Sequence, residues 1–189
     1  MGSINIGEVG KGTRLIFDNY PWLVLEVNFV KPGKGNAFYK LRVVNLITGN
    51  TLEKTLRGGE KVETADVADA NMQFLYADAN GFVFMDQQSF EQLTVAAKTV
   101  GDTKDFLLEN MEVGVTLWNG DPIQIRLPNT VTMEIDYTEP AIKGDTQSRV
   151  MKTAKLKGTG AEVQVPIFLA IGEKITINTQ TREYTGRSK

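Results

Sequence analysis

The sequence contains neither cysteine nor histidine. Without cysteine the chain can form no disulfide, no thiolate zinc site and no cysteine nucleophile. Without histidine it lacks the commonest general base and the commonest metal ligand. Most hydrolase triads and zinc hydrolase sites are therefore excluded. An enzyme that uses carboxylates or lysine is still possible, but enzymes as a class become less favoured.

Long apolar runs and a signal segment are also missing. The longest apolar tracts, such as residues 165–171, have the length of a strand, whereas a membrane span needs about 18 to 20 apolar residues. The first ten residues, MGSINIGEVG, show no basic start followed by an apolar core, so they do not look like a secretory signal. We therefore expect a soluble, cytoplasmic protein.

The 189 residues have an ordinary folding composition, 41% hydrophobic and 23% charged, with a net charge of −2. This composition excludes a largely disordered chain, and the net charge argues against coating bare nucleic acid by electrostatics alone. The charge is uneven, because residues 1–64 carry 9 Lys and Arg against 6 Asp and Glu, residues 65–128 carry 3 against 10, and residues 129–189 carry 9 against 7. An acidic middle between two mildly basic ends suggests separate modules. Three solvated surfaces that differ by chance would give the same pattern.

Short runs with alternating apolar and polar residues dominate the chain, and turn residues separate them. A helical pattern occurs only around residues 89–97 and 103–110, the second with Asp102 or Thr103 as a possible cap. Many short strands with few helices predict an all-β fold of small barrels. Strands are expected at 22–29, 38–43, 72–76, 82–85, 113–117, 123–127, 131–135, 163–167 and 174–178.

Two boundaries divide the chain into thirds. The acidic segment begins near Thr64, and Leu-Pro-Asn at 127–129 separates two strand-like runs. The expected domains are therefore 1–64, 65–128 and 129–189, each with the size of an SH3-like or OB-type barrel.

The segment VKPGKGNAF at 30–38 lies between the two best strands. Pro32 has a fixed φ, and Gly33 and Gly35 can take positive φ on either side of Lys34, which predicts a tight hairpin with Lys34 at its tip. Because neither neighbour of Lys34 has a side chain, a modifying enzyme could reach Lys34, or Lys34 could enter a narrow cleft. A solvated turn lysine would show the same spacing. A P-loop is less well supported, because the spacing and the following helix are missing.

Several further segments stand in a specific order around this hairpin: TGNTLEKT at 48–55, FMDQQSFEQL at 84–93, LWNGDPIQIRLPN at 117–129, KGDT at 143–146 and TGAEVQVPIFLAIGEKITINTQTREYTGR at 159–187. Together they resemble the bacterial elongation factor P family, translation factors that relieve ribosomes stalled on consecutive prolines. The resemblance covers nearly the whole chain. The full length favours this family over the eukaryotic and archaeal hypusine-containing factor, which lacks a third barrel.

The resemblance implies an SH3-like, KOW-type barrel followed by two OB-type barrels, arranged as an L similar in shape to tRNA. It implies a monomeric factor, without enzymatic activity and without a membrane partner, that binds rRNA and ribosomal proteins between the peptidyl and exit sites. The tip lysine, here Lys34, would reach toward peptidyl-tRNA, flanked by Lys31, Pro32, Gly33 and Gly35. No dissociable cofactor is implied. A lysine-modifying enzyme would instead extend Lys34, for example with β-lysine.

A second contact is implied near the exit-site codon of the mRNA. The family residues that approach this codon match Gly144, Asp145, Thr146, Tyr184 and Arg187. The chain departs from the family directly afterwards, because QSRVMKTAKL at 147–156 has Thr153 where proline is usual and adds basic residues. This departure changes the surroundings of the loop at 144–146 and does not affect Lys34. The added basic residues are Arg149, Lys152, Lys155 and Lys157.

Two other hypotheses compete with a translation factor. A general RNA binder would use aromatic platforms such as Trp118 and Tyr184, but the acidic middle segment argues against it. An enzyme would use carboxylate pairs, and those pairs more often cap helices or face water. The candidate pairs are Asp66 with Asp69 and Asp102 with Asp105. A mass increment localised to Lys34 in protein from the native host would favour the factor over both.

Overall fold

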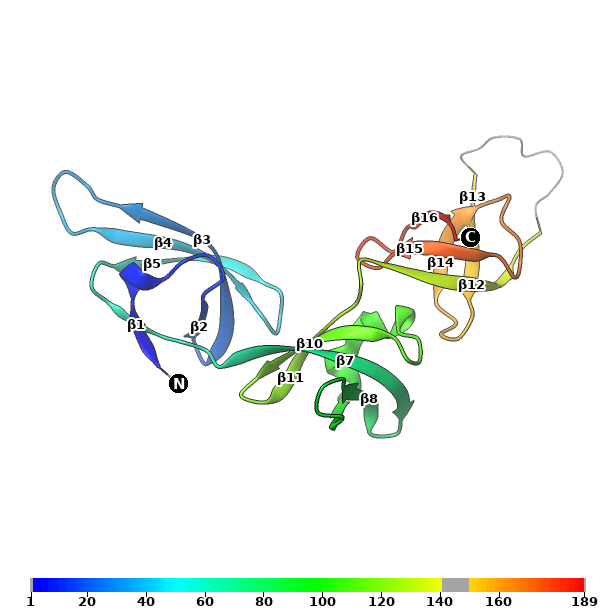
Figure 1. Ribbon diagram of the computed structural model, residues 1–189. Coiled ribbons are helices and arrows are strands. Elements are labelled where there is room, and N and C mark those ends of the chain that lie inside the picture. The colour runs from blue at the N-terminus through cyan, green and yellow to red at the C-terminus, as the bar shows by residue number, and fades with distance from the viewer. Residues whose placement is uncertain (1, 141–149, 189) are drawn as a thin grey trace. The chain divides into compact units, whose positions relative to one another are not determined.

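Strands make up most of residues 2–140 and 150–188, the part of the chain that the computed structural model describes (Figure 1). The helices found there are short: 3-10 helices η1 (Ile6–Glu8) and η2 (Gly101–Phe106), and α-helix α1 (Ala97–Val100). The all-β class is therefore confirmed. None of these helices is long and apolar enough to cross a membrane. The strands are β1 (Ser3–Asn5), β2 (Arg14–Phe17), β3 (Tyr20–Val30), β4 (Phe38–Asn45), β5 (Thr51–Arg57), β6 (Lys61–Glu63), β7 (Val67–Asp78), β8 (Gly81–Asp86), β9 (Gln92–Val95), β10 (Glu112–Trp118), β11 (Asp121–Arg126), β12 (Thr130–Thr138), β13 (Met151–Leu156), β14 (Glu162–Pro166), β15 (Lys174–Asn178) and β16 (Tyr184–Arg187).

The strands form three larger sheets and one two-stranded pair. The sheet orders are β2-β3-β4-β5, β11-β10-β7-β8-β9 and β14-β13-β12-β15-β16, and β1 pairs with β6. The chain divides into two compact units: one runs through Ala70 and includes Val115–Gln124, and the other contains Asn71–Gly114 and the chain from Ile125 onward. The expected boundaries near residues 64 and 128 stay a prediction, as does the L-shaped arrangement.

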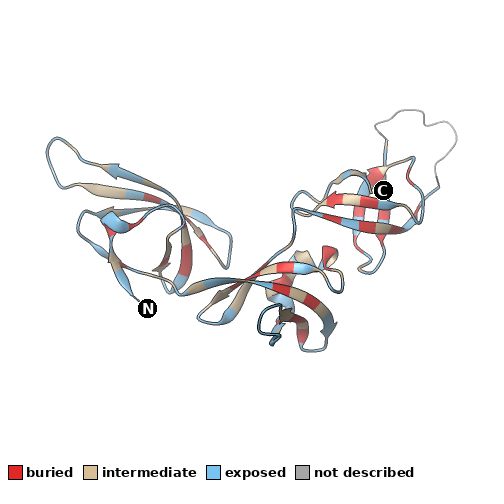
Figure 2. Ribbon diagram, viewed as in Figure 1, coloured by how far each residue is buried: buried red, intermediate tan, exposed pale blue. Residues whose placement is uncertain are grey.

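The core of the N-terminal sheet shows where simple alternation breaks down. Trp22 and Val24 are buried, whereas Val27 faces this core three residues later. The pairing of β3 with β4 shifts between Val24 and Glu26, which is a β-bulge. A bulge adds one residue and turns the following side chains to the other face. Strict alternation along residues 23–29 would place Leu23, Leu25, Val27 and Phe29 on one buried face, but of these only Val27 packs against this core, and Phe29 is exposed. Figure 2 shows the alternation of buried and exposed positions along the strands.

The helix expected around residues 89–97 is wrong. The carboxylate of Asp86 accepts hydrogen bonds from the backbone N–H groups of Gln88 and Ser89, both at 2.8 Å. These bonds turn the chain, and β9 then pairs with β8, with Val95 opposite Phe82. A side chain that bonds nearby backbone competes with helix formation in this way.

The helix expected at residues 103–110 is also different. The helical residues are Gly101–Phe106, in 3-10 geometry, and no side chain caps their start. Thr103 donates its hydroxyl to the carbonyl of Val100 instead of capping. The helix ends where Phe106, 1% exposed, enters the core of the last sheet together with Ile135, Leu156 and other residues.

Candidate functional site

The segment around Lys34 joins the two longest strands of the N-terminal sheet. Val30 of β3 and Phe38 of β4 form the last paired position, so Lys31–Ala37 form the connecting loop (Figure 1). Lys34 lies at the centre of this loop and is exposed, as are Lys31 and both flanking glycines, whereas Pro32 is partly buried. The structure thus places Lys34 at a hairpin tip, but the loop is longer than a tight two-residue turn.

The two glycines beside Lys34 differ. Gly35 has φ +117°, and a Cβ added there would lie 3.7 Å from Cγ of Pro32. Gly33 does not adopt positive φ, and a Cβ added to it would meet no heavy atom within 4 Å. Only Gly35 therefore uses the conformational freedom that the sequence suggested for both.

The base of the hairpin is braced on two sides. The rings of Phe29 and Tyr39, which face each other across β3 and β4, have centroids 4.9 Å apart. On the other side, the N–H of Gly58 donates to the carbonyl oxygen of Ala37 at 2.8 Å. A Cβ on Gly58 would come within 3.1 Å of that oxygen, so a larger residue would disturb the brace. The hairpin therefore has a stiff base and an open tip.

The charge around the tip has one sign. The loop contains Lys31 and Lys34, Lys40 follows in β4, and residues 27–41 include no Asp or Glu. Arg42, the next cation along β4, lies opposite Glu26 and Glu53. A cationic projection of this kind is suited to phosphate groups, which lysine binds as a point charge.

The expected codon-side residues are only partly within the described chain. Gly144, Asp145 and Thr146 lie outside the described residues. Arg187 ends β16, and its guanidinium lies 3.2 Å from the carboxylate of Glu173 and 5.0 Å from the ring centre of Phe168. The structure thus gives Arg187 two partners in the connection between β14 and β15.

Tyr184, expected near the codon or as an aromatic platform, is not fully open to solvent. It opens β16 opposite Ile177 and is half-buried against the core of the last sheet. An aromatic ring held in this way first serves packing, and only its outer edge can meet a ligand.

The additional lysines of 147–156 and Lys157 also have partners. Lys152 donates to the backbone oxygen of Glu139 at 2.6 Å, and Lys155 lies 3.7 Å from Glu162. Lys157 lies 2.8 Å from Glu134, and this hydrogen bond raises the pKa of Lys157 above its ordinary value. Lys155 and Lys157 are thus paired with carboxylates, and Lys152 is held by a backbone carbonyl. Arg149 lies outside the described residues.

The residues of the two competing hypotheses are engaged in structural contacts. Asp69 pairs with Arg14 and accepts the hydroxyl of Thr116, and Asp105 pairs with Arg182 at 2.7 Å. Trp118 is half-buried, and within the described chain its buried indole nitrogen has no hydrogen-bond partner. One carboxylate of each proposed pair is thus in an ion pair, and Trp118 is not an open stacking platform.

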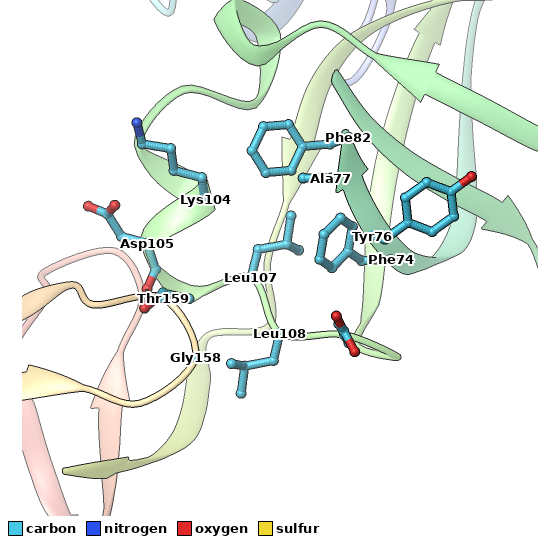
Figure 3. A pocket seen from close by; sticks show the side chains of 11 residues that line it. Phe74, Tyr76, Ala77, Phe82, Lys104, Asp105, Leu107, Leu108, Gly158 and Thr159 are labelled. Atoms are coloured by element: carbon cyan, nitrogen blue, oxygen red, sulfur yellow. Dashed lines mark hydrogen bonds between the residues drawn. The ribbon is translucent and has the colours of Figure 1, made fainter. Parts of the chain in front are cut away.

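Sequence reasoning missed a cavity of about 840 Å³ within the second compact unit (Figure 3). Aromatic side chains of β7 and β8, among them Phe74 and Phe82 with ring centroids 5.9 Å apart, form one wall. Lys104 of η2 and Thr159 line the other side. The apolar strand residues were visible in the sequence, but nothing local indicated that the loop at Thr159 would approach them.

Comparison with known proteins assigns each third of the chain to one family. Sequence models described as "Elongation factor P (EF-P) KOW-like domain", "Elongation factor P (EF-P) OB domain" and "Elongation factor P, C-terminal" match residues 5–62, 67–125 and 131–187. Two proteins named Elongation factor P, from Synechococcus sp. strains JA-2-3B'a(2-13) and JA-3-3Ab, are 44% and 42% identical over 184 residues. Each match covers 97% of this chain and 99% of the relative.

Solved structures resemble part of the chain. Eukaryotic translation initiation factor 5A from Methanococcus jannaschii superposes with a TM-score of 0.55 and 22% identity, covering 67% of this chain and 94% of that one. A translation initiation factor eif-5a family protein from Naegleria fowleri gives 0.54 and 16%, covering 67% and 98%. At these identities the likeness shows the fold alone.

Proposed function

Because the chain belongs to the elongation factor P family and is thus a translation elongation factor, we propose that it binds the ribosome between the peptidyl and exit sites and stimulates peptide-bond formation at consecutive prolines. The observation that carries this proposal is Lys34, exposed at the centre of a braced hairpin loop whose neighbourhood is cationic. The hairpin would approach the acceptor end of peptidyl-tRNA, with rRNA and ribosomal proteins around it.

The reach of the tip favours a modified lysine. An unmodified lysine places its ammonium only about 6 Å from its Cα. A lysyl-type extension, such as β-lysine added by a modifying enzyme, roughly doubles that reach and adds a donor. Lys34 is exposed, so its amine is open to such an enzyme. Charge-assisted hydrogen bonds to phosphate and sugar oxygens of the RNA would follow.

The factor would act by orientation and would itself break or form no bond. Proline has a restricted backbone and is a poor acceptor, so its reaction gains most when the peptidyl-tRNA is held in the productive geometry. Orientation of reactants can lower a barrier by several kcal/mol. The codon-side contact through Asp145 and Thr146 is part of the proposal, with Tyr184 and Arg187 as supports of that end of the chain.

The experiment compares Lys34→Ala with wild-type protein, purified from the native host, in a reconstituted translation assay on a proline-triplet reporter. We expect stimulation to be abolished or nearly so, because the described structure has no other side chain at the centre of the loop. The melting temperature should hardly change, since exposed positions usually shift stability by within about 0.5 kcal/mol.

Lys61→Ala is the matched control, an exposed lysine in β6 of the same end of the chain. It should stimulate as wild type does. Full stimulation by Lys34→Ala would overturn the proposed mechanism. Intact mass, followed by peptide mapping, should find the added group on Lys34.

A further inference from the structure

Arg14 connects the sheet that carries the hairpin with the next part of the chain. It opens β2, and one guanidinium nitrogen donates to the carbonyl oxygen of Val67 at 2.9 Å. The other terminal nitrogen pairs with the carboxylate of Asp69. Thr116 of β10, which is buried, donates its hydroxyl to Oδ1 of Asp69 at 2.8 Å. One carboxylate thus joins side chains from β2, β7 and β10.

Backbone bonds surround this cluster. The N–H of Ala65 donates to the carbonyl of Arg14 at 2.9 Å, and Leu15 forms an isolated bridge with Thr64. The N–H of Asn119 donates to the carbonyl of Asp66, also at 2.9 Å. All of these residues belong to one compact unit. The start of β7 is therefore fixed to β2 by both backbone and side chains.

The hairpin extends from this junction as a lever. Arg14 lies opposite Leu23 of β3, and β3 continues to Val30 directly before the loop. Seven residues of strand span about 23 Å. A rotation of about 5° at the junction would move the end of β3 by about 2 Å over that length. A misplacement of about 1 Å can already reduce a rate about 100-fold when orientation is the source of catalysis.

We propose that Arg14, Asp69 and Thr116 are positioning residues. They fix the direction of the Lys34 hairpin relative to the start of β7, so that the tip can reach its productive position. The inference rests on the proposed function. These side chains touch neither Lys34 nor the reacting groups, and they act through the direction of β3.

If the ion pair served stability alone, its loss would lower the maximal rate no more than it lowers stability. The side chains of Arg14 and Asp69 are 31% and 33% exposed, and ion pairs that meet solvent contribute little to stability. Loss of the pair should therefore change the melting temperature little. If the pair sets the hairpin angle, the maximal rate should fall much more than stability does.

Asp69→Asn is the test variant, since it removes the charge and keeps the shape. Asp18→Asn is its matched control, because Asp18 also forms an ion pair, 2.9 Å from Lys54, but within the hairpin's own sheet. In the proline-triplet assay, we expect the maximal rate of Asp69→Asn to fall about 10-fold, less than the about 100-fold of a fixed 1 Å displacement, because a loosened junction still visits the productive angle. The concentration for half-maximal stimulation should stay within about twofold, because the binding contacts are elsewhere. Asp18→Asn should match wild type in both.

Arg14→Lys is an intermediate case. A lysine can keep the ion pair with Asp69, but it lacks the planar fork that reaches Val67 at the same time. We expect its maximal rate to lie between those of wild type and Asp69→Asn.

A distance measurement tests the inference apart from the assay. The chain has no native cysteine, so spin labels can be placed at Thr55→Cys and Gln124→Cys, two exposed positions of the same compact unit. The distance distribution should broaden in Asp69→Asn and stay as narrow as wild type in Asp18→Asn. An unchanged distribution, a wild-type maximal rate for Asp69→Asn, or an equal loss in Asp18→Asn would each overturn the inference. Full stimulation by Lys34→Ala would instead overturn the proposed function.

Discussion

Arg182 and Asp105 form an ion pair with 2.7 Å between nitrogen and oxygen, although they lie 77 residues apart in the sequence. The guanidinium of Arg182 also lies 5.0 Å from the ring centre of Phe106. The turn before β16 is thereby attached to η2, next to the residue that η2 inserts into the core of the last sheet. Although η2 precedes β10 in the sequence, it is thus part of the structure of the last sheet.

Phe106→Ala should strongly destabilise the last sheet. The side chain is 1% exposed, and truncation of a buried phenylalanine costs about 3–5 kcal/mol. Urea unfolding followed by circular dichroism measures the loss, since neither Trp22 nor Trp118 belongs to the last sheet. Phe90→Ala is the control, since Phe90 is 69% exposed, and it should stay within about 0.5 kcal/mol of wild type. Equal stability of the two variants would contradict the assigned core position.

Gly35→Val and Gly33→Val should differ in the stalling assay. Valine resists the φ of +117° that Gly35 adopts, because its branched Cβ collides with the backbone there. We expect stimulation by Gly35→Val to fall at least about 5-fold through displacement of Lys34. Gly33→Val should keep stimulation within about twofold, since its Cβ enters open space. Equal loss in both variants would mean that the tip meets a narrow cleft.

Tyr184→Ala should lower the free energy of unfolding, in addition to removing any contact that the ring makes with mRNA. The ring is half-buried against the core of the last sheet, so its truncation should cost about 1–3 kcal/mol. Tyr184→Phe keeps the ring and should lose less than about 1 kcal/mol. A ribosome-binding defect in a stable Tyr184→Phe variant would assign the hydroxyl to recognition. Tyr137→Ala controls for general effects of losing a tyrosine, because Tyr137 is 54% exposed.

The turn before β9 should be sensitive to acid. Hydrogen bonds from the N–H groups of Ser89 and Gln88 hold the pKa of Asp86 below its ordinary value of 3.8. Asp86 therefore takes up its proton at higher pH in the unfolded chain than in the folded one. The stability that its charge contributes is complete above the ordinary value and is lost as pH falls through the folded value.

Melting temperatures of wild type and Asp86→Asn, followed from about pH 6 to about pH 3, test this expectation. Asparagine keeps an acceptor oxygen but has no charge, so the difference between the two proteins should shrink as the pH falls. Asp86→Ala removes the acceptor as well and should stay less stable throughout. A difference between wild type and Asp86→Asn that does not change with pH would contradict the role of the charge.

Local patterns were sufficient for much of the fold. Alternation and turn residues predicted the two strands that flank the hairpin and the position of Lys34 between them, because these features depend on neighbouring residues. The same reasoning did not anticipate β2, β5, β13 or β16. β2 and β16 have only four residues each, and in β5 and β13 charged or polar residues interrupt the apolar pattern. Their pairing partners therefore define these strands.

The errors have non-local causes. The face of β3 changes at a bulge, which no composition signal marks. Phe106 ends its helix because a core made by residues after 130 receives it. Arg14 and Asp69 lie 55 residues apart, and only the pairing of the strands brings them together. Gly33 and Gly35 differ in their backbone φ angles. The sequence cannot show this difference, because both residues are glycine.

The burial of Phe106 has a consequence for how this chain can be divided. A fragment that begins at residue 129 would lack this ring and leave a hole among Ile135, Leu156 and Ile175. A fragment that ends at residue 128 would carry the same ring into water. Cutting the chain at the boundary near residue 128 would therefore give two aggregation-prone fragments, unless residue 106 were changed at the same time. For this reason, the last third of the chain should fold stably only together with the short helix that precedes it.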